Sequence, residues 1–239
     1  METLETKKED KLQAYQIFDA VNRFSDEDAT YSIDVGNVTQ HSVRHLHLTP
    51  NNLWRISPKF ATMGNGLPGA LAANLEFPTR QAWSLSGDDG FGMVMQDIVT
   101  LVQHKIPSIH IVFSNMMYGF IKREQEETNE HLFYAVDFEE SVDFAKIAEA
   151  QEAVGYTIKS IDEIDEIFEK VIKNEKAGKV VVIDAKITNE QPIPVEALQL
   201  DTKYHSEEEV KAYKDHFEAW NLKPFREFLE AEGLESIKR

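Results

Sequence analysis

Five short runs of apolar residues recur along the chain and predict strands. They span residues 30–35, 81–85, 108–113, 154–158 and 179–187. These runs are five to nine residues long and rich in β-branched side chains, and most of them do not alternate with polar residues. Runs of this kind are typical of strands that are covered on both faces, as in a parallel sheet.

Segments with helical periodicity separate these runs. Apolar side chains recur at spacings of three and four within residues 11–24, 67–75, 91–104, 143–153 and 161–172. Strands that alternate with helices imply right-handed crossovers and a mostly parallel sheet. The pattern therefore predicts a doubly wound α/β fold with helices on both faces of the sheet.

The two ends of the chain differ from this central part. Residues 1–10 are charged and lack periodicity, so we expect a disordered tail or a cloning remnant there. The alternating pattern ends near two prolines, and residues 206–233 predict two amphipathic helices. We therefore divide the chain into the tail 1–10, an α/β domain over residues 11–200 and a C-terminal helical extension over residues 201–239.

Acidic residues outnumber basic ones, with 42 Asp and Glu against 25 Lys and Arg and a net charge of −17. Such a surface repels nucleic acid and anionic lipid, because both bind through Lys and Arg side chains that neutralise phosphate. We therefore expect neither nucleic acid nor a membrane as a partner. A phosphorylated ligand would have to be held by backbone amides or by a bound cation.

Cysteine is absent, which excludes disulfides, Cys-ligated zinc, iron–sulfur clusters and thiol nucleophiles. No apolar run reaches the roughly 18 residues that a membrane-spanning helix needs. Residues 1–10 are too charged for a signal peptide. We therefore expect a cytoplasmic protein.

Small and oxygen-bearing residues follow three of the predicted strands, at positions 34–37, 87–90 and 115–119. In an open parallel sheet, ligands bind at the carboxyl ends of the strands, near the point where the strand order reverses. The carboxylate of Asp88 and the amide oxygen of Asn115 are hard donors suited to Mg²⁺, which can bridge a diphosphate to an acidic protein. The alternative is an ordinary strand-end turn, in which Asp and Asn serve only as caps.

The segment from Gly87-Asp88 to Asn115 resembles the Gly-Asp-Gly…Asn motif of thiamine diphosphate enzymes, with the two proposed ligands 27 residues apart. The resemblance extends well beyond this motif and covers nearly all of residues 11–236. Five further segments are similar to the carboxy-terminal third of bacterial pyruvate oxidases, namely residues 31–37, 60–64, 118–121, 144–150 and 224–234.

The resemblance implies a role for each matching residue in gripping the diphosphate of thiamine diphosphate. The metal ligands for Mg²⁺ would be Asp88 and Asn115 through their side chains and Met117 through its backbone carbonyl. Met63 would lie beneath the cofactor and force its bent shape. Cofactor contacts are implied for Val35, Gly36, Asn37, Met63, Gly64, Gly87, Asp88, Asp89, Gly90, Asn115 and Tyr118.

The resemblance also implies a reaction. Pyruvate oxidases convert pyruvate, phosphate and oxygen to acetyl phosphate, carbon dioxide and hydrogen peroxide, with FAD as a second cofactor. Phe120 and Glu124 match positions that line the substrate and flavin side of the pocket, so we expect them to be the catalytic residues of this chain. The FAD site itself is expected outside this chain.

Two parts of a full pyruvate oxidase are not found in the sequence. One is an amino-terminal domain that supplies a glutamate to activate the aminopyrimidine ring, and the other is a middle domain that binds flavin. The family's site also lies between two chains, so we expect a homo-oligomer or a complementary chain, and no activity from this chain alone. The alternatives are a split-gene subunit of a 2-oxo acid decarboxylase and a non-catalytic module that has lost cofactor binding.

Two residues depart from the pattern of the family. Asp89 stands where glycine is usual, and we expect it to tolerate a left-handed turn and to weaken diphosphate binding unless its carboxylate points away or joins the metal. A frame shifted by one, with Asp89 as the ligand, is the alternative, but Asp88 directly follows the predicted strand. Met116 stands where many members have asparagine, and we expect this change to cost little.

Overall fold

The computed structural model describes residues 11–128, 132–189 and 206–212. Six strands form one sheet in which every neighbouring pair is parallel, in the order β2-β1-β3-β4-β6-β5. The strands are β1 (Thr30–Ile33), β2 (Leu53–Arg55), β3 (Ala82–Gly87), β4 (Ser108–Ser114), β5 (Val154–Ile158) and β6 (Val180–Lys186). The predicted doubly wound α/β fold is thus confirmed.

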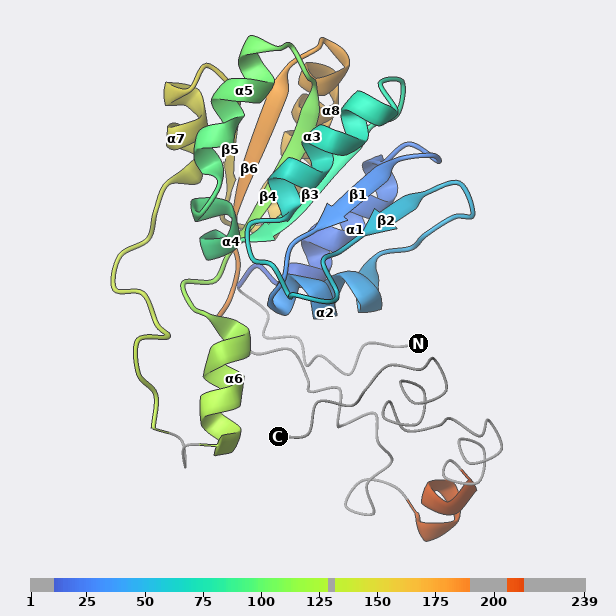
Figure 1. The fold of residues 1–239 in the computed structure, drawn as a ribbon, viewed down its shortest axis with the longest axis vertical. Helices are drawn as coiled ribbons and strands as arrows, with labels where there is room; N and C mark the ends of the chain where they lie inside the picture. Colours follow the sequence, from blue (N-terminus) through green and yellow to red (C-terminus); the bar gives the residue numbers. More distant parts are fainter. Residues whose placement is uncertain (1–10, 129–131, 190–205, 213–239) are drawn as a thin grey trace, which may run out of the picture. The chain divides into compact units, whose positions relative to one another are not determined.

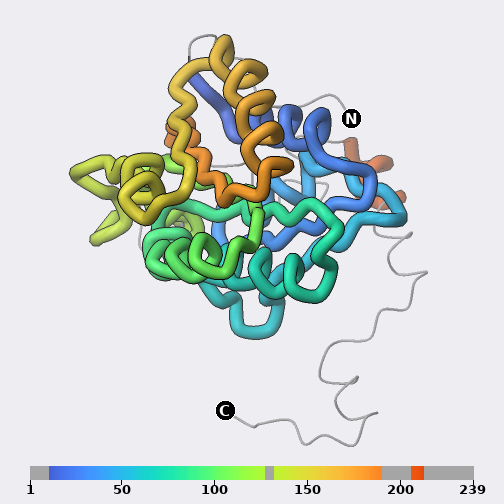
Figure 2. Tube along the Cα trace, turned by 90° about the horizontal axis from the view of Figure 1, so that it is seen from above, coloured from blue at the N-terminus to red at the C-terminus, as the bar shows by residue number. Residues whose placement is uncertain are grey.

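Helices cover both faces of the sheet, as Figures 1 and 2 show from two directions. One face is covered by α1 (Ala14–Phe24) and α8 (Ile164–Lys176). The other face is covered by α3 (Gly66–Glu76), α4 (Asp88–Gly92), α5 (Ile98–Gln103) and α7 (Phe144–Ala150). Two further helices, α2 (Asn37–His45) and α6 (Gly119–Thr128), follow the carboxyl ends of β1 and β4, and α6 projects away from the sheet (Figure 1).

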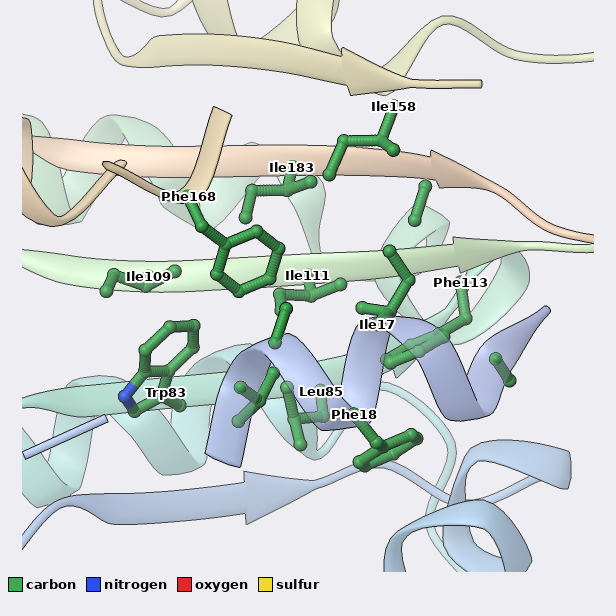
Figure 3. Close-up of a cluster of buried hydrophobic side chains, with 14 of the residues drawn as sticks. Ile17, Phe18, Trp83, Leu85, Ile109, Ile111, Phe113, Ile158, Phe168 and Ile183 are labelled. Carbon is green, nitrogen blue, oxygen red and sulfur yellow. The ribbon is translucent and has the colours of Figure 1, made fainter. Parts of the chain in front are cut away.

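The larger part of the core lies between the sheet and the layer of α1 and α8 (Figure 3). Phe18 of α1 stacks on Phe113 of β4 at 5.0 Å between ring centroids, and Phe168 of α8 lies 6.3 Å from Trp83 of β3. Burying a large apolar side chain contributes roughly 1.5–3 kcal/mol. This packing fixes the sheet and, with it, the places where the strands end.

The register brings the carboxyl ends of the central strands together. Ile33 of β1 pairs with Leu85 of β3, and Gly87 of β3 pairs with Phe113 of β4. The chain leaves β1 toward β2 and returns to the other side of β1 as β3, so the strand order reverses between β1 and β3. A crevice at such a point is where ligands bind in sheets of this class.

Three local features differ from the sequence prediction. Strand β2 was not predicted, because its three residues are too few to give a periodic signal. Residues 91–104 do not form one helix: α4 ends at Gly92, a 3₁₀ turn covers Met95–Asp97, and α5 begins at Ile98. The helices α2, α4 and α6 all begin within the strand-end segments 34–37, 87–90 and 115–119, which were predicted as ligand loops.

The chain divides into two compact units, residues 1–192 and 193–239. The predicted tail 1–10, the predicted boundary at residue 200 and most of the predicted C-terminal helices lie outside the described residues. Among the described residues, no helix combines the length and apolar character that crossing a bilayer requires.

His110 makes the stability of this core depend on pH. It is fully buried on β4, its Nε2 lies 2.8 Å from Ser108 Oγ, and burial lowers its pKa to about 3. Between an unfolded pKa of about 6.5 and this value, the unfolded chain binds a proton that the folded chain does not, so stability falls as pH falls.

We expect the difference in unfolding free energy between wild type and His110→Gln to shrink by about 1.4 kcal/mol from pH 7.5 to 5.5 in urea denaturation.

The matched control is His104→Gln, because His104 is exposed. The corresponding difference for this variant should change much less over the same pH range. A difference for His110→Gln that stays constant with pH would contradict a neutral, buried His110.

Candidate functional site

A cavity of about 220 Å³ lies at the carboxyl edge of the sheet, among the segments that follow β1, β3 and β4. All but one of the residues predicted for the site line this cavity. They are Val35, Gly36, Asn37, Met63, Gly87, Asp88, Asp89, Gly90, Asn115, Met117, Tyr118, Phe120 and Glu124. The exception is Gly64, whose backbone N–H donates to Asp34 Oδ1 at 2.9 Å.

Asp88 is the first residue of α4 and follows β3 directly. Its side chain accepts two backbone hydrogen bonds, from Met116 N to Oδ2 at 2.7 Å and from Asp89 N to Oδ1 at 3.1 Å. The residue is only 7% exposed, and burial is the main reason why its pKa is raised to about 6. The bond to Met116 joins the segment after β3 to the segment after β4.

Asn115 and Met117 lie in the segment after β4. Asn115 Oδ1 accepts a hydrogen bond of 3.3 Å from Met117 N, while Tyr118 N donates to Val136 O at 2.9 Å. Met116 between them has a φ of 59°, in the left-handed region that costs about 1 kcal/mol for most side chains and less for asparagine. The departure at Met116 therefore has a backbone cost that sequence analysis did not anticipate.

Asp89 adopts a conformation different from the expected one. It lies within α4 and is not among the residues with positive φ, so no left-handed turn is needed at this position. The nearby Asp89 carboxylate raises the pKa of Tyr118 to about 12, and burial raises the pKa of Asp89. Asp89 Oδ2 is buried and has no hydrogen-bond partner within the described residues.

Gly90, which directly follows Asp89, has no space for a side chain. A Cβ atom at this position would lie 2.5 Å from Asp34 Oδ2, a separation that real Cβ atoms do not tolerate. In contrast, a Cβ atom at Gly87 or at Gly92 would meet no heavy atom within 4 Å. Gly90 is therefore required where α4 packs against Asp34.

The segment after β1 offers fewer free amides than expected. Val35 N donates to Asp34 Oδ1 at 2.8 Å, so this amide is already used within the chain. Gly36 has a φ of 146° and precedes Asn37, the first residue of α2. The positive end of the α2 dipole is therefore directed toward the cavity edge, where an anion is favoured.

The remaining predicted residues come from two further segments. Met63 is half-buried in the loop before α3. Phe120 and Glu124 are four residues apart on α6, so they share one face of that helix. Phe120 is half-buried and Glu124 is exposed.

Asp34 lies in the strand-end segment 34–37, and no role was predicted for it from the sequence. In the structure Asp34 is completely buried, and burial raises the pKa of its carboxyl group. The residues that it contacts, Gly64 and Gly90, lie 30 and 56 positions further along the chain, so no local motif could have identified it.

The comparisons with known proteins agree with one another. Residues 34–185 match the family model described as thiamine pyrophosphate enzyme, C-terminal TPP binding domain. The chain is 44% identical over 236 residues to a pyruvate oxidase of Lactiplantibacillus plantarum, covering 99% of this chain and 39% of that protein. It is also 36% identical over 190 residues to a putative thiamine pyrophosphate-containing protein of Bacillus subtilis, covering 80% of this chain and 32% of that one.

A solved structure shows the same fold. It is a thiamine diphosphate-dependent 4-hydroxybenzoylformate decarboxylase from Rhodococcus jostii, which matches with a TM-score of 0.70 and 21% identity over 80% of this chain and 35% of that one. The chain thus spans about two fifths of the pyruvate oxidase and about a third of the other two proteins. Taken with the fold and the cavity, these matches show that the chain belongs to the thiamine pyrophosphate enzymes, as the C-terminal TPP-binding domain of a pyruvate oxidase-like member.

Proposed function

We propose that the cavity binds Mg²⁺ and thiamine diphosphate in an enzyme that converts pyruvate, phosphate and oxygen to acetyl phosphate, carbon dioxide and hydrogen peroxide. The charge of the cavity lining is the observation that supports this most directly. Asp88, Asp89 and Glu124 line the cavity, and its described lining includes neither Lys nor Arg. A diphosphate would be repelled from such a lining unless a cation bridged it to the protein.

The donor set fits Mg²⁺. We assign the side-chain oxygens of Asp88 and Asn115 and the backbone carbonyl of Met117 as its ligands, and all three are hard oxygen donors. Mg²⁺ typically takes one or two protein carboxylates and completes its shell with phosphate oxygens and water. No three His, Asp or Glu side chains within the described ranges are placed to hold a metal together, as a zinc site would require.

The proposed metal site accounts for the burial of the Asp88 carboxylate. Burial raises its pKa to about 6, which means that its negative charge is poorly compensated within the chain. A divalent cation next to this carboxylate would stabilise the charged form. Asp88 therefore fits better as the motif ligand than Asp89, because Asp88 is more deeply buried and its side chain is held by the segment that carries Asn115 and Met117.

The remaining cofactor contacts follow from the same arrangement. We assign the diphosphate to the backbone of Val35, Gly36 and Asn37, at the start of α2, with Gly87 and Gly90 at the start of α4. Met63, with Gly64 beside it, would pack against the thiamine part of the cofactor.

Once bound, thiamine diphosphate supplies a ring that accepts the electron pair released by decarboxylation. The residues of this chain contribute positioning, since they orient the cofactor and exclude water from it. Phe120 and Glu124 would line the side where pyruvate and FAD enter, as the catalytic residues of this domain. The activating glutamate and the FAD site would come from other domains or a complementary chain, in a homo-oligomer, so this domain alone would not complete the reaction.

We expect thiamine diphosphate to bind only when Mg²⁺ is present, and Asp88→Ala to weaken binding at least about 100-fold, since a metal ligand is lost. Isothermal titration calorimetry of the 239-residue chain measures both effects. Asp162→Ala serves as the control because Asp162 is exposed and far from the cavity lining. Binding without Mg²⁺, or unchanged binding by Asp88→Ala, would contradict the proposed site, and no binding at millimolar ligand would favour the non-catalytic module.

The charge of Asp88 should lower the stability of the metal-free chain. The pKa of Asp88 in the folded chain is about 6, above the usual value of 3.8, so the folded chain holds this proton more tightly than the unfolded chain does. The protonated carboxyl group therefore favours folding fully below pH 3.8, and this contribution is lost as the pH rises through 6. In EDTA at pH 7.5, we expect Asp88→Asn to raise the unfolding free energy by about 1–2 kcal/mol, although it impairs Mg²⁺ binding.

Urea denaturation at pH 7.5 and pH 4 tests this expectation. The gain should fall to near zero at pH 4, where Asp88 is largely protonated. Glu149→Gln removes the same charge from an exposed position and should change stability by less than about 0.5 kcal/mol. If Asp88→Asn were less stable than wild type at pH 7.5, the expectation would be contradicted, because other groups of the chain would then stabilise the negative charge of Asp88.

A further inference from the structure

Asp34 follows β1 and is completely buried next to Val35, which lines the proposed cofactor cavity. One of its oxygens, Oδ1, accepts hydrogen bonds from Val35 N at 2.8 Å and from Gly64 N at 2.9 Å. The first bond is local. The second joins the end of β1 to the loop before α3, and Gly64 is the neighbour of Met63 in that loop.

Few other hydrogen bonds join the loop before α3 to the sheet within the described residues, although the buried Gly64 also packs against Met93 and Val94. Phe60, Ala61 and Thr62 are exposed, and Phe60 has 88% of its surface accessible. Besides the Gly64 bond, Ser32 Oγ donates to Asn65 O at 3.4 Å, which is long for a hydrogen bond. The short bond to Asp34 is therefore the stronger restraint on the position of Met63.

The segment after β1 has further anchors besides the bond from Val35 N to the Asp34 side chain. The backbone of Asp34 accepts from Thr39 Oγ1 at 2.8 Å and donates to Leu85 O at 2.9 Å. Thr39 N also donates to Gly36 O at 2.9 Å. Removing the Asp34 carboxylate should therefore release the Met63 loop and the Val35 amide, while the backbone bonds keep the start of α2 in place.

We infer that Asp34 is a positioning residue, which fixes Met63 against the thiamine half of the cofactor and thereby sets the affinity for that half, not for the diphosphate. This inference depends on the proposed function of the cavity. Asp34 acts through Gly64 and Met63 and does not itself contact the cofactor.

Binding of two different ligands distinguishes this positioning role from a general structural role of Asp34. Thiamine diphosphate contacts both the Met63 loop and the metal side of the site, whereas inorganic diphosphate contacts only the metal side. With Mg²⁺ present, we expect Asp34→Ala to raise the Kd for thiamine diphosphate at least about tenfold. Its Kd for inorganic diphosphate should stay within about threefold of the wild-type value, as measured by calorimetry on the full chain.

Asp34→Asn is the conservative variant, because an amide oxygen accepts the same two backbone hydrogen bonds. We expect it to bind both ligands as wild type does. If Asp34→Ala does not fold, Asp34→Ser replaces it, because the shorter hydroxyl cannot span the distance to Gly64 N. We expect Asp34→Ser to give the same selective loss.

A double-mutant cycle tests whether Asp34 acts through Met63. Once Met63→Ala has removed the side chain, adding Asp34→Ala should weaken thiamine diphosphate binding no further. Three outcomes would overturn the role of Asp34. They are an equal rise in the Kd for both ligands in Asp34→Ala, no rise in either Kd, and effects of Asp34→Ala and Met63→Ala on thiamine diphosphate binding that add fully in the double variant. Failure of the wild-type chain to bind either ligand with Mg²⁺ would instead overturn the proposed function, and the inference with it.

Discussion

The hydrogen bond of 2.7 Å from the Met116 amide to Asp88 Oδ2 joins the segments after β3 and β4, and the proposed site depends on it. Both segments hold donors assigned to one metal ion, so their separation has to be fixed before the ion binds. The parallel register of β3 and β4 brings the two strand ends together, and this bond sets the final distance. The strain at Met116, with its left-handed backbone, is the local cost of this arrangement.

The acidic character of the chain explains why the proposed site needs a cation. A chain with a net charge of −17, whose described cavity lining includes no Lys or Arg, has little electrostatic means of holding a diphosphate by itself. Under the proposed function, diphosphate binding depends on a divalent cation, and we expect the buried carboxylate of Asp88 to lower stability when no cation is bound. Asp34 and Gly90 serve a different purpose, since they determine how closely the segments around the cavity pack.

Much of the fold could be predicted because its strands are buried on both faces and therefore consist of nearly continuous apolar residues. The three-residue β2 was missed for lack of length, and the break at Gly92 was missed because the apolar spacing continues across it. The cavity residues were identified from a local motif and a resemblance. Asp34 could not be identified in this way, because its contacts with Gly64 and Gly90 exist only after the sheet has formed. The helical conformation of Asp89 was likewise set by α4 and not by its own residue type.

A crystal structure of the chain with Mn²⁺ in place of Mg²⁺, and with thiamine diphosphate, tests the central claim most directly, because the anomalous signal of manganese locates the ion. The account predicts a single peak within about 2.3 Å of Asp88 and Asn115 side-chain oxygens and of the Met117 carbonyl, with the diphosphate on its other side. A peak at Asp89 with none at Asp88, or a diphosphate bound in the cavity without an ion, would contradict the account.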